Sequence, residues 1–195
     1  MISLSVSDTI SLVTRSEPQY SNIALVGFMG TGKTVVGQAL AHELSFEFLD
    51  TDHLIEEACQ ESIPNIFEHH GENAFREMEV KVLEGLSGKK KTVISTGGGL
   101  VSHNDNMKKL KEISLVVCLW ANENTIWNRV KTQKHRPLLN RPDAYDFIRQ
   151  KLEERKSHYK KAHLLINTEN RSIKMITQII KQNFFKQSPI AIHMK

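Results

Sequence analysis

From Ile23 onward, short apolar runs alternate with segments in which apolar residues recur at helical spacing. Ile23–Val26 is apolar throughout, which is typical of a parallel strand buried on both faces. In Thr34–Leu44 the apolar residues at 36, 39, 40 and 44 fall on one face of a helix. This alternation favours βαβ units arranged around a parallel sheet.

The same pattern continues along the chain and predicts five strands in all. The later strands are expected at Phe46–Leu49, Thr92–Ser95, Leu115–Trp120 and His163–Ile166. Helices are expected over His53–Gln60, after Ser62 with Pro64 in the first turn, and over Asn73–Leu86, Thr125–Val130, Ala144–Lys160 and Ile173–Ile180. The basic, proline-containing segment Lys131–Asp143 predicts a mobile lid between helices. We therefore expect a three-layer α/β fold, with a five-stranded parallel sheet flanked by helices.

The 195 residues are enough for one domain and little more. Residues 1–22 are Ser-rich and are expected to form a flexible N-terminal extension, residues 23–185 a single domain, and residues 186–195 a C-terminal tail. No apolar run approaches the roughly 20 residues that a membrane span needs. The N-terminal residues also lack the basic start and apolar stretch of a secretory signal. We expect a cytoplasmic protein with no membrane partner.

Charge and cysteine content narrow the function classes only slightly. The net charge is +4, with basic residues concentrated in Lys131–Arg141 and Lys151–Lys161. Such a small excess fits either a solvated basic face or the binding of anionic metabolites, and it does not require nucleic acid. Cys59 and Cys118 lack metal-ligand spacing, so we expect two ordinary thiols in a reduced, intracellular protein.

The segment directly after the first predicted strand reads GFMGTGKT and fits the P-loop pattern G-x-x-x-x-G-K-[ST]. Glycines let the backbone curl so that its N–H groups and the start of the next helix face phosphate oxygens. Lys33 is expected to reach the β- and γ-phosphates, and the Thr34 hydroxyl to bind Mg²⁺. The sequence therefore predicts a nucleoside triphosphate site built from Gly27, Gly30, Thr31, Gly32, Lys33 and Thr34.

Two further motifs follow predicted strands, at the edge where open α/β sheets bind ligands. After the second strand, Asp50 and Asp52 offer one carboxylate for metal-bound water and another that can accept a proton. Either aspartate could instead be only the N-cap of the helix that follows. After the third strand, Gly97–Gly99 would let a ligand touch the backbone closely, although a flexible turn is the alternative.

Taken together, these motifs make the chain similar to the shikimate kinases, small P-loop kinases of the nucleoside monophosphate kinase-like type. The resemblance is carried by GFMGTGKT at 27–34, LDTD at 49–52, IFEHHGENAFREME at 66–79, STGGGLV at 95–101, RPLL at 136–139 and ERKSHY at 154–159. It implies a P-loop kinase fold and ATP-dependent phosphorylation of the 3-hydroxyl of shikimate, on the chorismate route to aromatic amino acids. It also implies Mg²⁺ as cofactor, ATP and shikimate as the only ligands, and a monomer.

The resemblance implies roles for individual residues. Asp52 matches the carboxylate that bonds the substrate hydroxyls and acts as the base, and Asp50 matches the one near the metal. Arg76 and Arg155 match the arginines that bind the shikimate carboxylate. The other matches are Gly98 and Gly99 with backbone against the ring, Glu79 beside Arg76, Arg136 as the catalytic lid arginine on the transferring phosphate, and Arg129 near the nucleotide.

Several of these assignments have structural alternatives. Arg76 and Glu79 lie three residues apart on a predicted helix, so they can pair either to aim the guanidinium at a carboxylate or as a plain surface salt bridge. Arg129 could be an ordinary surface arginine. The aromatic residues Phe67, Phe75 and Trp127 could simply pack, and the adjacent His69 and His70 are expected at the surface.

The C-terminal part departs from the family pattern. Asn167 stands where the family's adenine loop often has an acidic residue, and no proline follows. Arg171 could still stack on the base. Two rival functions also remain: a kinase for another small acid such as gluconate, and a nucleotide-binding module that has lost its chemistry. The second would be expected to have lost a carboxylate or the lid arginine, whereas Asp50, Asp52 and Arg136 are all present.

Overall fold

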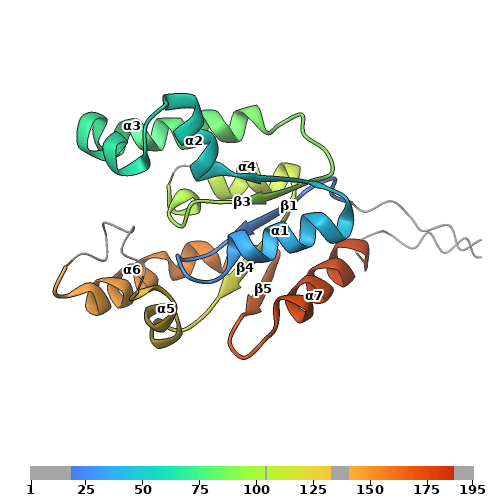
Figure 1. Cartoon of the computed structure of the whole chain (residues 1–195). Coiled ribbons are helices and arrows are strands. Elements are labelled where there is room, and N and C mark those ends of the chain that lie inside the picture. The colour runs from blue at the N-terminus through green and yellow to red at the C-terminus, as the bar shows by residue number, and fades with distance from the viewer. Residues whose placement is uncertain (1–18, 104, 133–140, 187–195) are drawn as a thin grey trace, which may run out of the picture.

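The computed structural model describes residues 19–103, 105–132 and 141–186, and a parallel β-sheet forms its centre (Figure 1). The strands of this sheet are β1 (Ile23–Val26), β2 (Glu47–Asp50), β3 (Thr92–Ser95), β4 (Leu115–Trp120) and β5 (Leu164–Asn167). They lie in the order β2-β3-β1-β4-β5, and every neighbouring pair runs parallel. The predicted α/β fold with a five-stranded parallel sheet is confirmed.

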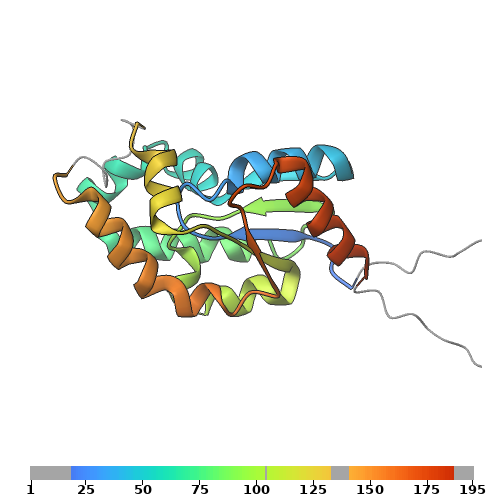
Figure 2. The ribbon, with the colours of Figure 1, turned by 90° about the horizontal axis from the view of Figure 1, so that it is seen from below.

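Helices cover both faces of the sheet, which the turned view of Figure 2 separates. One face packs against α1 (Lys33–Leu44) and α7 (Ile173–Lys186). The other packs against the C-terminal part of α3 (Ile63–Gly85), η1 (Leu100–Ser102), α4 (Asn106–Ile113), α5 (Glu123–Val130) and α6 (Ala144–Tyr159). A small separate cluster joins α2 (Thr51–Cys59) to the rest of α3. The chain therefore forms three layers.

The central strand β1 shows why its sequence is apolar at every position. Ile23 and Leu25 pack toward α1 and α7, whereas Ala24 and Val26 pack into the opposite layer. All four side chains are fully buried. Burying each of the larger side chains, Ile23, Leu25 and Val26, contributes about 1.5–3 kcal/mol to the free energy of folding. The strand is therefore stabilised by packing on both of its faces. The loop that follows Val26 thus starts from a rigid support.

The two helices expected after Ser62 and over Asn73–Leu86 are both present. They share the label α3 and meet at a kink at Gly71, whose backbone angles (φ 78°, ψ 174°) are not helical. The short elements η1 and α4 were not predicted. Helix α4 spans eight residues and buries only Met107 and Leu110 among its apolar side chains.

The packed region begins before Ile23, earlier than the expected domain boundary. Asn22 is buried, and its side chain donates to the carbonyls of Lys89 (2.8 Å) and Ile113 (3.1 Å) and accepts from the N–H of Thr92 (3.1 Å). At the other end, α7 includes Lys186, one residue beyond the expected boundary. Among the described residues, no helix combines the length and apolar character that crossing a bilayer requires.

Candidate active site

The P-loop connects β1 to α1 and depends on glycine at two crowded positions. Gly27 (φ 140°) and Gly30 (φ 75°) both have backbone angles that side-chain-bearing residues rarely adopt. A Cβ on Gly27 would collide with the carbonyl oxygen of Leu119, and one on Gly30 would lie 2.6 Å from the Val130 side chain. The N-cap of helix α1 is Gly32, which has no side chain to cap the first turn, and the N-terminal end of a helix attracts anions.

The polar residues of this loop bring a hydroxyl and a carboxylate together. Thr34 donates from Oγ1 to Asp50 Oδ2 at 3.3 Å, which joins the start of α1 to the end of β2. Lys33 Nζ donates to the carbonyl of Phe28 at 3.1 Å, and Thr31 Oγ1 donates to the same carbonyl at 2.8 Å. Hydroxyl and carboxylate oxygens are ligands that Mg²⁺ prefers, so Thr34 and Asp50 fit this ion.

Asp50 also caps the helix that follows it. Its Oδ1 accepts from the backbone N–H of Asp52 at 3.1 Å, so the capping alternative raised by the sequence is correct for this residue. Capping uses Oδ1, whereas Thr34 contacts Oδ2. The two roles are therefore compatible.

Asp52 lies in the first turn of α2, in an environment that favours the protonated form of its carboxyl group more than water does. Burial raises the pKa of the Asp52 carboxyl to about 6, the negative charge of Asp50 adds to the increase, and the positive charge of Lys33 opposes it. The carboxylate lies directly against Gly97, where an added Cβ would collide with Asp52 Oδ1. A carboxyl group with a pKa close to the working pH is well suited to accept a proton from a hydroxyl.

The two arginines expected to bind a carboxylate converge on the triple-glycine loop after β3. A Cβ added at Gly99 would lie 3.2 Å from an Arg76 guanidinium nitrogen and 3.3 Å from one of Arg155. The neighbouring Gly98 faces the P-loop instead, where its Cβ would lie 3.4 Å from the backbone nitrogen of Met29. The glycine loop thus separates the two cationic side chains from the phosphate loop by only a few atoms.

Carboxylates on α3 hold Arg76 in place. Arg76 donates to Glu79 Oε2 at 2.8 Å and to Glu72 Oε1 at 2.8 Å. The Glu79 side chain is only 1 % exposed, so this pair is not the surface salt bridge that the sequence also allowed. Burial raises the pKa of the Glu79 carboxyl, and the positive charge of Arg76 counteracts the increase. The guanidinium is therefore fixed on one side by two carboxylates, which leaves its other side to face the glycine loop.

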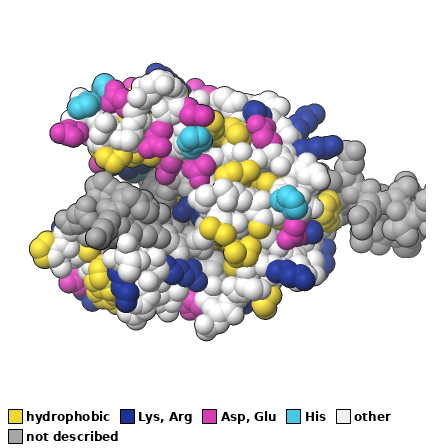
Figure 3. All heavy atoms as spheres, viewed as in Figure 1, with side chains coloured by type: hydrophobic (Ala, Val, Ile, Leu, Met, Phe, Trp, Pro, Cys, Tyr) yellow, Lys and Arg dark blue, Asp and Glu magenta, His cyan; other side chains and the backbone are white. Residues whose placement is uncertain are grey.

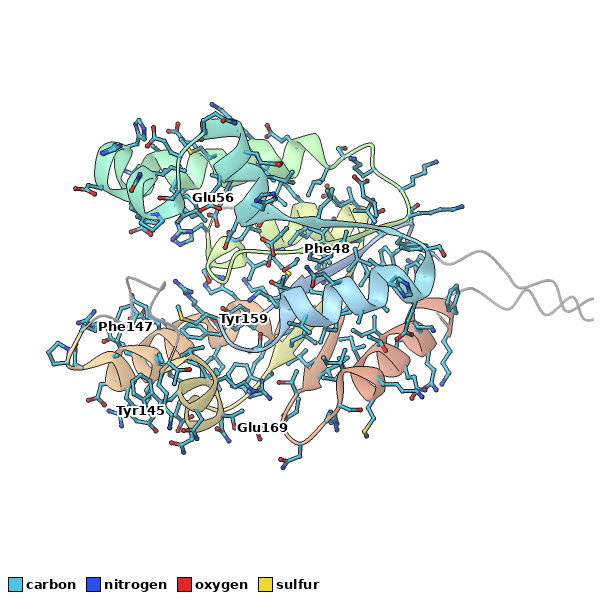
Figure 4. The ribbon with its side chains drawn as sticks, viewed as in Figure 1. Phe48, Glu56, Tyr145, Phe147, Tyr159 and Glu169 are labelled. Atoms are coloured by element: carbon cyan, nitrogen blue, oxygen red, sulfur yellow. The ribbon has the colours of Figure 1, made fainter. Side chains whose placement is uncertain are left out.

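Tyr159 is a structural partner of the site that sequence reasoning did not identify. Its hydroxyl donates to the carbonyl of Gly98 at 2.6 Å, and Figure 4 places the side chain on the inner side of α6, near the centre of the molecule. Arg155 lies four residues earlier on the same helix, with its guanidinium 5.6 Å from the centre of the Phe28 ring. The spacing of four in ERKSHY was the available signal, because such residues share one helix face.

The remaining arginines do not converge in the same way. Arg129 donates to the carbonyl of Gly30 at 3.1 Å and to the hydroxyl and carbonyl of Thr168 at 3.0 Å each, so it ties the P-loop to the segment after β5. Arg171 is exposed and donates to the carbonyl of Asn167 at 2.7 Å. Arg136, the expected lid arginine, lies outside the described residues. Nucleotide contacts for all three stay predictions.

Two of the aromatic residues singled out in the sequence, Phe75 and Trp127, pack in the interior, and the Arg76 guanidinium lies over the Phe75 ring, 5.2 Å from its centre. Phe75 is buried in the cluster between α2 and α3, and its ring lies 4.8 Å from that of the more exposed Phe67. Trp127 packs against the core and meets the Tyr145 ring edge-on. The packing alternative is therefore correct for Phe75 and Trp127.

A parallel sheet with a phosphate-binding loop after its central strand, and a carboxylate and two arginines beside that loop, defines a P-loop kinase. A family model described as shikimate kinase matches residues 29–184. This match covers most of the chain, and the chain belongs to the shikimate kinase family.

Individual relatives agree with this family. The chain is 42 % identical to the shikimate kinase of Thermodesulfovibrio yellowstonii over 162 residues, which cover 83 % of this chain and 94 % of the relative. It is 43 % identical to that of Sulfurihydrogenibium sp. over 159 residues, or 82 % of this chain and 95 % of the relative. The solved shikimate kinase of Acinetobacter baumannii in complex with shikimate superposes with a TM-score of 0.82 at 38 % identity, over 88 % of this chain and 97 % of that one. The family prediction is confirmed.

More distant structures share only the fold. A gluconokinase from Sinorhizobium meliloti superposes with a TM-score of 0.52 at 15 % identity, over 86 % of this chain and 97 % of that one. An identity this low shows a shared fold and carries no information about the substrate.

Proposed function

We propose that this chain transfers the terminal phosphoryl group of ATP to the 3-hydroxyl of shikimate, with Mg²⁺ as cofactor. The observation that carries the proposal is the convergence at Gly97–Gly99: Asp52 lies against Gly97, Gly98 faces the P-loop, and Arg76 and Arg155 reach Gly99. A hydroxyl acceptor that carries a carboxylate fits such a site, since its acid group can meet two guanidinium groups while a hydroxyl meets Asp52.

The phosphate side of the reaction rests on the P-loop. Its backbone N–H groups and the start of α1 would hold the triphosphate, and Lys33 would place a positive charge on the oxygens that gain charge during transfer. When bound, Mg²⁺ would neutralise phosphate charge, with Thr34 and Asp50 as the residues that hold it. Phosphoryl transfer has a loose transition state, so positioning and charge neutralisation supply most of the rate.

The acceptor side rests on Asp52 and the two arginines. Asp52 would take the proton of the attacking hydroxyl, because its raised pKa makes it a better base than an exposed aspartate. Arg76 and Arg155 would bind the substrate carboxylate, with Glu72 and Glu79 keeping Arg76 aimed. Arg136 keeps the role that the family resemblance gives it, contact with the transferring phosphate.

We also propose that the enzyme works as a monomer in the cytoplasm, without nucleic acid or membrane partners.

A coupled assay of ADP release tests the proposed reaction. With ATP and Mg²⁺ present, shikimate should increase ADP release at least a hundredfold over the rate without an acceptor, and gluconate should not. Equal release with shikimate and with gluconate would contradict the substrate assignment, and equal release with and without shikimate would contradict the kinase activity. If shikimate does not increase ADP release, calorimetric titration of shikimate shows whether the chain still binds it, as a module that has lost its chemistry would.

A further inference from the structure

Two histidines and a glutamate meet at the corner between α2 and α3. Glu61 lies between the two helices, and His69 and His70 lie on α3 just before the kink at Gly71. His69 Nδ1 is 3.1 Å from Glu61 Oε2, and His70 Nε2 is 3.3 Å from Glu61 Oε1. In Figure 3, histidine and acidic side chains gather at the end of the molecule where Figure 1 shows α3.

Adjacent helical residues normally point in different directions, which is why the sequence indicated two separate surface side chains. In the structure, both side chains reach the same carboxylate, that of Glu61. Each ring presents a different nitrogen, Nδ1 from His69 and Nε2 from His70, and the Glu61 carboxylate offers one oxygen to each. The two rings lie edge to face, with centroids 6.1 Å apart and an angle of 83° between their planes.

We propose that Glu61, His69 and His70 form a binding site for a divalent transition metal of the zinc type. All three ligand atoms lie within 4.8 Å of one another. A tetrahedral ion with bonds of about 2.0–2.2 Å separates its ligands by about 3.3–3.6 Å. His69 contacts Glu61 Oε2 at 3.1 Å and His70 contacts Oε1 at 3.3 Å, so both rings already lie against the same carboxylate, and small shifts of these side chains would bring one oxygen and the two nitrogens to the spacing around an ion.

The chemistry of the donors separates this site from the one for Mg²⁺. Imidazole nitrogens suit Zn²⁺, Cu²⁺ and Ni²⁺, whereas Mg²⁺ takes oxygen ligands almost exclusively. The three side chains are between 31 % and 56 % exposed, so an ion can reach them from solvent and water can complete its coordination. With three ligands and free access to solvent, we expect a dissociation constant in the micromolar range.

The position of the site connects it to the substrate arginine. Gly71 has a backbone kink and Glu72 follows it, and Glu72 is one of the two carboxylates that hold Arg76. An ion bound by Glu61 on one side and by α3 on the other would fix the α2–α3 corner next to this kink. The binding itself does not depend on the proposed kinase function, so each can fail without the other.

Calorimetric titration of ZnCl₂ into the untagged full-length chain, in a non-chelating buffer with millimolar Mg²⁺, tests the proposal. We expect one zinc ion per chain with micromolar affinity, and at least tenfold weaker binding in each of E61Q, H69N and H70N. The matched control is H53A. His53 pairs with Glu57 on α2 at 3.3 Å, and within the part of the chain that the structure describes the two belong to no group of three metal ligands, so its loss should leave the affinity unchanged.

A second measurement does not depend on how the variants fold. In the wild-type protein, the imidazole ¹⁵N resonances of His69 and His70 should move together on zinc addition, and that of His53 should not. Absence of micromolar binding, affinity unchanged in E61Q, or an equal loss in H53A would each overturn the proposal, as would unmoved resonances of His69 and His70.

Discussion

At the scale of the single residue, Asp52 carries the clearest chemical signature. Its carboxyl group lies against Gly97, close to the negative charge of Asp50 and the positive charge of Lys33. Burial is the largest cause of its raised pKa. The sequence could place Asp52 at the end of a strand, but it could not show the burial, which depends on how α2 and the glycine loop pack together.

We expect the pH dependence of the reaction to follow this pKa. A base must be ionised to act, so kcat/KM should rise with pH up to about 6 and then become level. The D52N variant should lose about 10²–10⁴-fold in kcat, and its remaining activity should lack that rise. A wild-type profile with no inflection near pH 6 would contradict the role of Asp52 as the base.

The same substitution should make the protein more stable. The folded pKa of about 6 lies above the ordinary value of 3.8, so the folded state binds the proton more tightly, and its stability falls as pH rises between these values. At pH 7 the ionised carboxylate disfavours folding by an amount on the order of 1–3 kcal/mol, which D52N removes. Thermal unfolding should show a higher Tm for D52N at pH 7 and no gain at pH 3.5. A lower Tm at pH 7 would contradict this explanation of the pKa.

At the scale of the element, the strands and the long helices could be predicted because each has a pattern of its own. The apolar runs of β1, β3 and β4 were placed at the residues where the structure has them. The break in α3 falls in the gap between the two helices expected from the sequence, but the positive φ of Gly71 could not be predicted from the pattern. The pairing of Arg76 with Glu79 could be predicted from their spacing of three residues. The burial of Glu79 could not, because it depends on the packing of the surrounding helices.

The kink at Gly71 gives a test of this element. G71A would force a residue with a Cβ into a positive φ of 78°, which costs about 1 kcal/mol, although no atom lies within 4 Å of the added carbon. Gly85, at the end of α3, also has open space around it and lacks a positive φ, so G85A is the matched control. Urea unfolding should show a loss of stability for G71A and none for G85A. Equal stabilities would mean that the kink is not retained in solution.

Helix α6 offers a second test through Tyr159. Y159F removes the hydroxyl that donates to the Gly98 carbonyl and leaves this carbonyl without that hydrogen bond. The free energy of unfolding should fall by about 1–3 kcal/mol. Because Gly98 and Gly99 adjoin the arginines, KM for shikimate should rise several-fold, more than the change in KM for ATP. The control is Y145F, because Tyr145 bonds Asn124 at the exposed end of the same helix (Figure 4). An unchanged KM for shikimate in Y159F would exclude the positioning role.

At the scale of the whole molecule, the sheet brings the motifs together. The P-loop and the glycine loop follow β1 and β3, and Asp50 is the last residue of β2; these three strands lie next to one another in the sheet. Since the carboxyl ends of parallel strands meet at one edge, the sequence already indicated a shared site there. The order of the strands could not be read from the pattern, because a run of apolar residues shows that a strand is buried and does not show which strands lie beside it.

Truncation tests where the folded domain begins. A chain that starts at residue 19 should keep the Tm of the full chain, because it retains Tyr20, which meets His163, and Asn22. A chain that starts at Ile23 should lose several degrees, since Asn22 bonds three backbone groups. Equal Tm values for the two truncated chains would contradict the anchoring role of these residues.

Phosphorus NMR of the reaction product tests the central claim most directly, because it shows which oxygen receives the phosphoryl group. After incubation of the enzyme with ATP, Mg²⁺ and shikimate, we expect a phosphate monoester signal coupled to the hydrogen on carbon 3 of the ring. The D52N sample should show almost no such signal in the same time. Inorganic phosphate as the sole product, or a monoester at another ring position, would contradict the arrangement of Asp52, the P-loop and the two arginines around one acceptor.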